Sequence, residues 1–276
     1  MDDALILDGG FRWDKKHVSK GIHAQETTSG VIPSYKDEWL PSVFNSAFGC
    51  TVWPFDKHGL NARYSTSNQS NSLYANRQGQ LLNGPKEIRY DAGYIGKWSK
   101  LANFTFTVFR KKLSGTPVYQ GSYTYSGMQV PYYSPSFIRR YGFESEIKGE
   151  IFDGMSYFAN YAFIHSRDYV LEAEEPNIPQ HVGSFGFTYQ HRGWDFNALV
   201  QRVSGYRDNF LVTGNNYVKI GDYWQGDLNV SYEFKVDTKT HKIYLSVRNI
   251  GDVRYQTVPG WRDFGREIYV GYDLKF

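Results

Sequence analysis

The chain has 276 residues, of which 18% are aromatic, and its mean hydropathy is −0.54. A net charge of +3, scattered along the sequence, is too small to indicate nucleic-acid binding, and no run of roughly eighteen apolar residues could form a transmembrane helix. The single cysteine, Cys50, excludes an internal disulfide and a cysteine-based metal site.

Alternating apolar and polar residues recur along the whole chain, and a period of two is typical of β-strands with one apolar face. The alternation predicts strands near 4–18, 41–54, 59–67, 87–98, 103–112, 137–152, 155–166, 181–190, 194–205, 223–235, 242–254 and 266–276. Most of these segments have ten or more residues. Soluble strands have a mode of about 5–6 residues, whereas a strand that crosses a bilayer at a tilt needs about 9–11.

The connections between these strands alternate between short and long. The short ones are "FDKH", "SKLA", "FDG", "HRG" and "KVDTKTH", and the long ones lie near 19–40, 68–86, 113–136, 167–180, 206–222 and 255–265. Short turns on one side and long loops on the other are typical of outer-membrane barrels. We therefore predict an all-β fold, an antiparallel transmembrane β-barrel wall, because hydrocarbon leaves a free strand edge without partners.

The C-terminal sequence "VRNIGDVRYQTVPGWRDFGREIYVGYDLKF" resembles the ending of TonB-dependent outer-membrane receptors. "GPKEIRYDAGYIGKW" and "RRYGFESEIKGEI" resemble strands of the same family, so that the similarity covers most of the chain in order. Gly251 replaces the phenylalanine that is usual in the C-terminal motif. The residues that match the motif are Asn249, Asp252, Tyr255, Pro259, Gly260, Gly265, Arg266 and Phe276.

The resemblance implies that residues 1–276 are the C-terminal portion of a plugged barrel of about twenty-two strands. No plug precedes the predicted strands, so coupling to TonB, which the plug would carry, is assigned to no residue of this chain. The resemblance also implies a place in the Gram-negative outer membrane, in contact with lipid and lipopolysaccharide. The terminal strand, closing on Phe276, resembles the signal that the β-barrel assembly machinery recognises.

Eight residues in the long loops are predicted to contact a small-molecule ligand. Tyrosine offers a rigid surface with a polar tip, and arginine can hold an anion through two N–H groups. The same side chains could instead form an aromatic girdle, pack the loops or contact lipopolysaccharide. They are Tyr123, Tyr125, Tyr132, Tyr133, Tyr206, Arg207, Trp261 and Arg262.

The sequence indicates neither a metal site nor a cofactor. The run "LEAEEPNIPQH", with Glu172, Glu174, Glu175 and His181, could hold calcium, but charge runs in loops are more often solvated. No Gly-x-Ser-x-Gly, phosphate-loop or zinc motif is present, so we predict no enzyme.

The preferred function is TonB-coupled uptake of a scarce ligand such as an iron–siderophore, another metal chelate or a vitamin. A passive porin of twelve strands is the first alternative, and its selectivity would come from the lumen charges Glu144, Glu146, Lys148 and Glu150. A soluble all-β binding protein is the second alternative.

Overall fold

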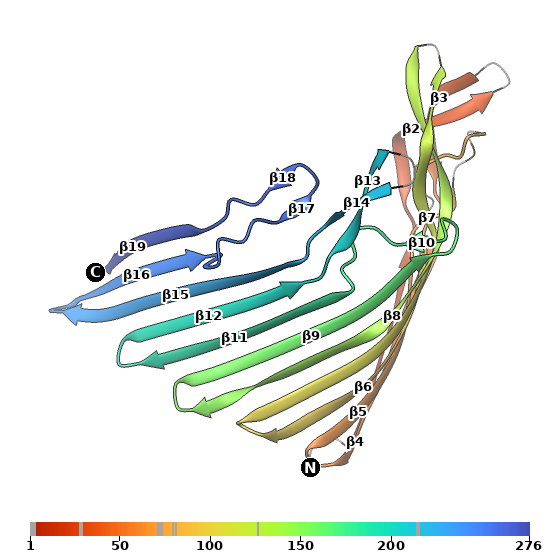
Figure 1. The fold of residues 1–276 in the computed structure, drawn as a ribbon. Helices are drawn as coiled ribbons and strands as arrows, with labels where there is room; N and C mark the ends of the chain where they lie inside the picture. Colours follow the sequence, from red (N-terminus) through yellow and green to blue (C-terminus); the bar gives the residue numbers. More distant parts are fainter. Residues whose placement is uncertain are drawn as a thin grey trace.

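The computed structural model describes residues 4–27, 30–70, 74–78, 80, 82–125, 127–213 and 216–276, and they form one large curved sheet (Figure 1). Its wall strands pair in the order β1-β4-β5-β6-β7-β8-β9-β11-β12-β15-β16-β19. All of these pairs are antiparallel, which confirms the predicted fold class. The bounds are β1 (Leu5–Asp14), β4 (Val43–Phe55), β5 (His58–Asn68), β6 (Lys86–Ser99), β7 (Ala102–Tyr125), β8 (Met128–Phe152), β9 (Met155–Asp168), β11 (His181–His191), β12 (Trp194–Val203), β15 (Tyr223–Val236), β16 (Lys239–Arg248) and β19 (Glu267–Lys275).

The register sorts the side chains into an apolar and a polar face. Residues opposite each other in paired strands share a face, and one such row runs from Leu5 through Val52 and Leu60 to Tyr94. Many large apolar side chains on this face are exposed, as the lipid side of a barrel requires. On the polar face, Arg63 Nη2 donates to Asp8 Oδ1 over 2.8 Å.

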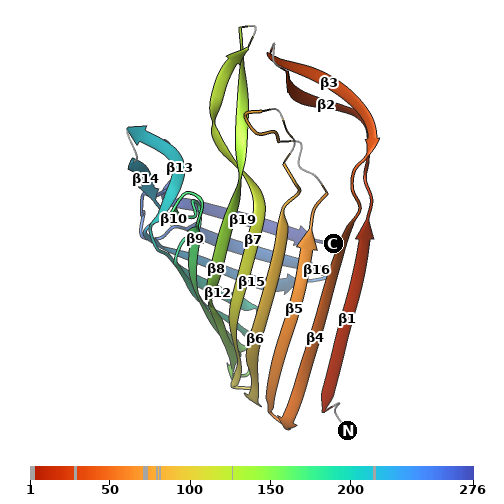
Figure 2. The same ribbon diagram turned by 90° about the vertical axis from the view of Figure 1, so that its right-hand side faces the viewer.

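One end of the sheet, called the turn end, carries the short connections, and the opposite end, called the loop end, carries the long ones (Figure 2). The turn between β11 and β12 consists of Arg192 and Gly193, both with positive φ (46° and 85°). Two such residues match the twist of the flanking strands. The turn predicted over 235–241 is shorter than expected, since Val236 already pairs with Lys239.

Three of the predicted long loops are in fact largely β-structure. β2 (His17–Thr27) pairs with β3 (Gly30–Trp39), and β13 (Tyr206–Thr213) pairs with β14 (Asn216–Ile220). β7 and β8 continue through the predicted loop 113–136 as a two-stranded arm. The prolines of this segment are tolerated because neither strand of the arm pairs with a further wall strand there. The outer edge of β8 is bonded at Tyr133, whose N–H donates to the Ala75 carbonyl over 2.9 Å.

The predicted strand 242–254 is also wrong at its second half. β16 ends at Arg248, and the chain then runs through β17 (Gln256–Val258) and β18 (Trp261–Arg262) to β19. A further short strand, β10 (Ala173–Glu174), pairs with β9.

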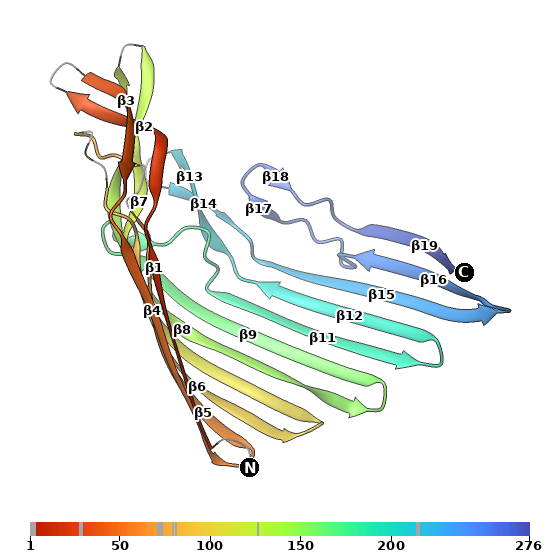
Figure 3. The same cartoon turned by 180° about the vertical axis from the view of Figure 1, so that it is seen from behind.

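β1 and β19 are the two ends of the strand order, and within the described residues each pairs with one neighbour only. Figure 3 shows these two strands at opposite margins of the curved sheet, so the wall is open. In the part of the chain that the structure describes, no helix has the length and apolar character needed to span a membrane.

Candidate functional site

A cavity of about 350 Å³ lies at the loop end, between β9, the segment 174–180 and the hairpin of β13 and β14. Figure 1 shows β10, β13 and β14 gathered at this end of the wall. The lining is mixed in charge, with two cations, three carboxylates, a tyrosine and a histidine among its side chains. These side chains are Arg207, Lys219, Glu174, Glu175, Asp222, Tyr206 and His165.

Glu175 forms one wall of the cavity and is held by two residues of the polar face. Arg140 donates from Nε to Glu175 Oε2 over 2.6 Å and from Nη2 to Oε1, and the Ser166 hydroxyl donates to Oε2. The side chains of Arg140 and Glu175 are both mostly buried. This fork-to-carboxylate geometry fixes the 174–180 segment against β8 and β9.

Arg207 connects β13 to the same segment. Its Nη2 donates to the Glu174 carbonyl, and its own carbonyl accepts the Asn177 N–H over 2.7 Å. The structure thus places Arg207, predicted from the sequence as a ligand contact, at the cavity and gives its guanidinium a backbone partner. Lys219, opposite Arg207 in the hairpin register, is the exposed cation of the lining.

Tyr206 joins the cavity to the last loop of the chain. Its hydroxyl donates to the Thr257 carbonyl over 3.5 Å, and the Gly221 N–H donates to the Gln256 carbonyl over 3.1 Å. Burial raises the pKa of Tyr206, and the charge of Asp208 raises it further. Tyr206 therefore stays a neutral donor and acceptor at physiological pH.

Trp261 and Arg262 lie in β18, close to Tyr206 in the fold but outside the described lining of the cavity. Trp261 is 78% exposed. The predicted pair is therefore not part of the wall of this cavity.

The four predicted tyrosines of the arm are a separate group. The Tyr123 and Tyr132 ring centroids lie 6.3 Å apart, and the Tyr133 ring lies 4.5 Å from that of Tyr74. Tyr125 pairs with Met128 through the backbone, and its side chain lies outside the described residues. Tyr133 also lines a second cavity, of about 480 Å³, together with amide side chains such as Asn76, Gln80 and Asn83. The sequence-predicted residues thus divide among three places, which are the loop-end cavity, β18 and the arm of β7 and β8.

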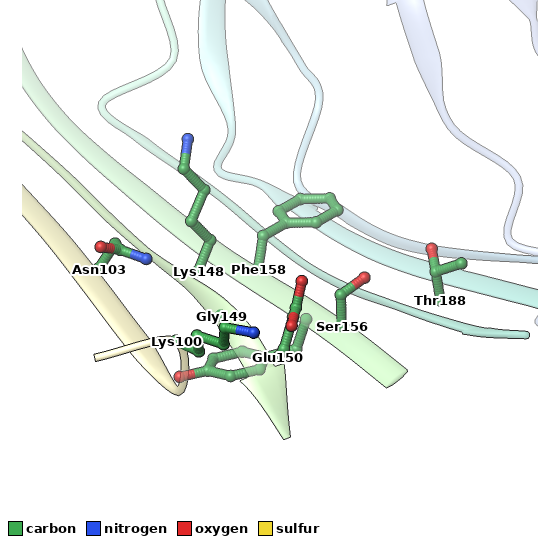
Figure 4. Close-up of a pocket in the computed structure, with 9 residues that line it drawn as sticks. Lys100, Asn103, Lys148, Gly149, Glu150, Ser156, Phe158 and Thr188 are labelled. Carbon is green, nitrogen blue, oxygen red and sulfur yellow. The ribbon is translucent and has the colours of Figure 1, made fainter. Parts of the chain in front are cut away.

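A third cavity, of about 460 Å³, lies at the turn end (Figure 4). Lys148, Ser156, Phe158 and Thr188 point to the same side of the sheet there. Lys148 pairs with Glu146 over 2.8 Å. The alternating charges of β8 therefore lie on the polar face, as their alternation predicts.

The C-terminal motif residues close the loop between β16 and β19. Asn249 is 2% exposed with a φ of 49°, donates from Nδ2 to the Val253 carbonyl over 2.8 Å and accepts the Val253 N–H over 3.0 Å. Its own N–H donates to Asp227 Oδ1 over 2.8 Å. Asp252 Oδ1 accepts the Arg266 N–H over 2.9 Å. These bonds give the motif a structural role at the end of the wall.

The rest of the motif completes the same loop. Tyr255 donates its hydroxyl to Gln225 Oε1 over 2.8 Å, and its ring stacks on Tyr223 at 3.7 Å. Pro259 and Gly260 make the turn between β17 and β18, where Gly260 has a φ of 83°. Phe276 follows β19 and is 91% exposed, and its ring centroid lies 5.1 Å from Lys239 Nζ.

Sequence reasoning missed Arg140 and Ser166 as partners of Glu175. The acidic run containing Glu175 was visible, but its partners lie 35 and 9 residues away, at positions that only the β8–β9 register brings together. Within the described ranges, no three His, Cys, Asp or Glu side chains lie close enough to hold a metal ion.

The sequence matches the family model for TonB dependent receptor-like β-barrels over residues 1–250. A search of curated proteins gives no match. Solved structures that share the fold include the following three. The ferric-catecholate import receptor Fiu of E. coli K12 aligns with a TM-score of 0.73 and 16% identity, over 98% of this chain and 42% of Fiu. The copper transporter OprC aligns with a TM-score of 0.75 and 15% identity, over 98% of this chain and 45% of OprC. The ferripyoverdine receptor of the Pseudomonas aeruginosa outer membrane, bound to ferripyoverdine, aligns with a TM-score of 0.76 and 18% identity, over 99% of this chain and 36% of the receptor. The chain therefore spans less than half the length of each.

Proposed function

The chain belongs to the TonB-dependent receptor β-barrel family, and from that premise we propose that it forms part of the wall of an outer-membrane receptor that takes up a scarce small ligand. Solved structures that are similar to it include an import receptor for ferric catecholates, a copper transporter and a ferripyoverdine receptor. We propose a metal chelate, such as an iron–siderophore, or a vitamin as the ligand. The named neighbours are receptors and transporters, so we propose no catalysis.

The observation that carries this proposal is the loop-end cavity between β9 and the β13–β14 hairpin. It combines Arg207, Lys219 and Tyr206, groups that can hold a chelate bearing carboxylate, catecholate or phenolate oxygens. Of the three carboxylates in the lining, Glu175 repels an anionic ligand least, because Arg140 already neutralises its charge. Lys219 is the cation whose exposure makes it available for the first contact.

The partners of the proposed receptor follow from its two faces and its last strand. The apolar face would contact membrane lipid and lipopolysaccharide, and β19 with Phe276 would be recognised by the barrel assembly machinery. Energy coupling to TonB would require a plug segment, and no residue of this chain is assigned to it.

The alternatives demand features that the fold does not favour. A passive porin of these twelve strands requires β1 to pair with β19, and they are the two margins of the sheet. In a soluble protein, large apolar side chains that are at least 60% exposed would lie in water, which is unfavourable. These side chains include Leu7, Trp13, Trp224 and Val270.

The test is ligand binding by the full chain refolded in detergent micelles. Ferric catecholates, ferric hydroxamates, copper chelates and cobalamin are titrated separately, and quenching of the tyrosine and tryptophan fluorescence is measured. We expect one class to bind, and Lys219→Gln to weaken its binding about tenfold, since a charge-assisted hydrogen bond contributes about 1.5–3 kcal/mol. Lys235→Gln, an exposed cation at the turn end, is the matched control. A chain that inserts into micelles and binds none of the four classes contradicts the proposal.

A further inference from the structure

A groove of about 290 Å³ lies on the apolar face, near the loop end, across β9, β11, β12 and β15. The register aligns Tyr161, Gly183, Arg202 and Trp224 in one row, with Phe185 and Val200 side by side one step nearer the turn end. Gly183 contributes no side chain to its row. The hollow between Tyr161 and Arg202 therefore follows directly from the glycine.

The floor of the groove is apolar and open to the surroundings of the sheet. Phe185 is 49% exposed and Trp224 is 60% exposed, although both are large apolar side chains. A folded domain in water would bury such a surface against a partner, whereas the lipid side of a barrel meets acyl chains there.

The upper rim of the groove is cationic. The Arg202 guanidinium lies over the Trp224 ring, 5.6 Å from its centroid, and Nη2 also contacts Asp222 Oδ1. Arg202 precedes the last residue of β12, so it sits where the wall meets the loops. A guanidinium has five N–H donors, so the contact of Nη2 with Asp222 does not use up the donors of Arg202. An aromatic ring with an adjacent cation at this depth matches the boundary between acyl chains and headgroups.

We propose that this groove binds one anionic lipid of the loop-side leaflet, with an acyl chain lying over Gly183 between Tyr161 and Val200 and the lipid phosphate held by Arg202. The proposal rests on the proposed place of the chain in the outer membrane. Phe185 and Val200, beneath Arg202, are apolar, and two other polar side chains at the groove, Tyr161 and His181, bond to each other through the Tyr161 hydroxyl and His181 Nδ1 over 2.7 Å. A sugar or a peptide would therefore find few free hydrogen-bond partners there. Asp222 competes with the phosphate for Arg202, which keeps the binding reversible.

The experiment is native mass spectrometry of the full chain refolded in detergent micelles, titrated with phosphatidylglycerol or with phosphatidylcholine of the same acyl chains. We expect the wild type to bind the anionic lipid more tightly. Arg202→Gln should weaken phosphatidylglycerol binding about tenfold and leave phosphatidylcholine binding unchanged. Asp222→Asn should strengthen phosphatidylglycerol binding, because it frees the guanidinium. Asn is compatible with the φ of 62° at this position.

A second pair of variants tests the acyl-chain part of the groove. A Cβ on Gly183 would meet the Asn160 carbonyl oxygen at 3.4 Å and Tyr161 Cδ2 at 3.5 Å, ordinary contacts, so Gly183→Leu should fold and fill the groove. It should reduce the binding of both lipids, whereas Ala62→Leu, an exposed small residue of the same face in β5, should not.

Equal binding of the two lipids, or no effect of Arg202→Gln on phosphatidylglycerol, overturns the inference. Displacement of the lipid by inorganic phosphate alone also overturns it, since the site would then recognise a free anion. These results concern the groove only. A chain that shows no heat-modifiable, micelle-inserted form would instead count against the proposed membrane function.

Discussion

Arg140 and Glu175 face each other in a two-point contact, although one belongs to the polar face of β8 and the other to the loop after β9. The pair is mostly buried, with side-chain exposures of 22% and 13%. It is the link through which the wall positions the loop-end cavity.

Glu175→Gln should loosen this loop and lower the free energy of unfolding by about 1–3 kcal/mol, because the Arg140 guanidinium loses its charged partner. Cleavage of the segment 169–180 by a protease should become faster at the same time. The matched control is Glu146→Gln, which breaks the exposed pair with Lys148 and should cost less than about 1 kcal/mol. Equal effects of the two variants in urea titrations would contradict this account of the loop.

Asn249→Ala should destabilise the end of the wall by about 2–4 kcal/mol. The substitution removes two side-chain hydrogen bonds to Val253 and places alanine at a φ of 49°. Asn249→Gly separates the two causes, since glycine accepts this φ but forms neither bond, and it should cost about half as much. The measurement is the temperature at which the heat-modifiable band on a gel is lost. An alanine variant as stable as the glycine variant would show that the backbone conformation contributes nothing.

Gly265→Ala and Gly260→Ala form a second matched pair, with φ values of 79° and 83°. A Cβ at Gly260 would meet no atom within 4 Å, so only the left-handed backbone should cost energy, about 1–2 kcal/mol. A Cβ at Gly265 would lie 2.7 Å from Asp252 Oδ1, the atom that accepts the Arg266 N–H. The Gly265 variant should therefore lose about 1 kcal/mol more in the same gel assay. Identical midpoints for the two variants would rule out the Asp252 contact as a source of stability.

Tyr255 should make the protein less stable at high pH. Burial, followed by the hydrogen bond and charge of Asp263, raises the pKa of its phenol above the ordinary value of 10.0. The folded state thus favours the protonated form. Its stabilising effect is fully present below about pH 10 and is lost as the pH rises from there toward the raised pKa. The difference in unfolding free energy between wild type and Tyr255→Phe should shrink over this interval. Asp263→Asn should lower the upper end of the interval and so narrow it, because the unfolded-state pKa does not change. A difference independent of pH would be evidence against a raised pKa.

The wall of the fold could be predicted from the sequence because each wall strand has one side on the apolar face of the sheet and one on the polar face. Alternation such as that in "FESEIKGEI" identified β8 and its polar charges correctly. The arm of β7 and β8 could not be identified in this way, because beyond Ser114 its two strands leave the wall and have no lipid-facing side. Pro117 also stands opposite Pro135 there, and proline is unusual in a strand. Without a buried face there is no periodicity to detect.

The candidate site was predictable only in part. Tyr206 and Arg207 were chosen for their chemistry and do line the loop-end cavity, and their role as ligand contacts stays a prediction. Arg140 could not be chosen, because nothing around it in the sequence distinguishes it from Arg139, which faces the other side of β8. The strand register, which the sequence does not state, decides which of the two arginines reaches Glu175.

The length of the arm determines what the protein exposes farthest from the turn end. Beyond Ser114, the last residue that β6 pairs with, β7 runs on for eleven residues to Tyr125, which at about 3.3 Å per residue carries it roughly 36 Å past the neighbouring strand. Tyr123 and Tyr132 lie near its tip. None of the residues at this tip lines the loop-end cavity. The part of the arm that extends farthest and the candidate ligand site are therefore physically separate, so the sequence of the tip can vary without altering the lining of the cavity.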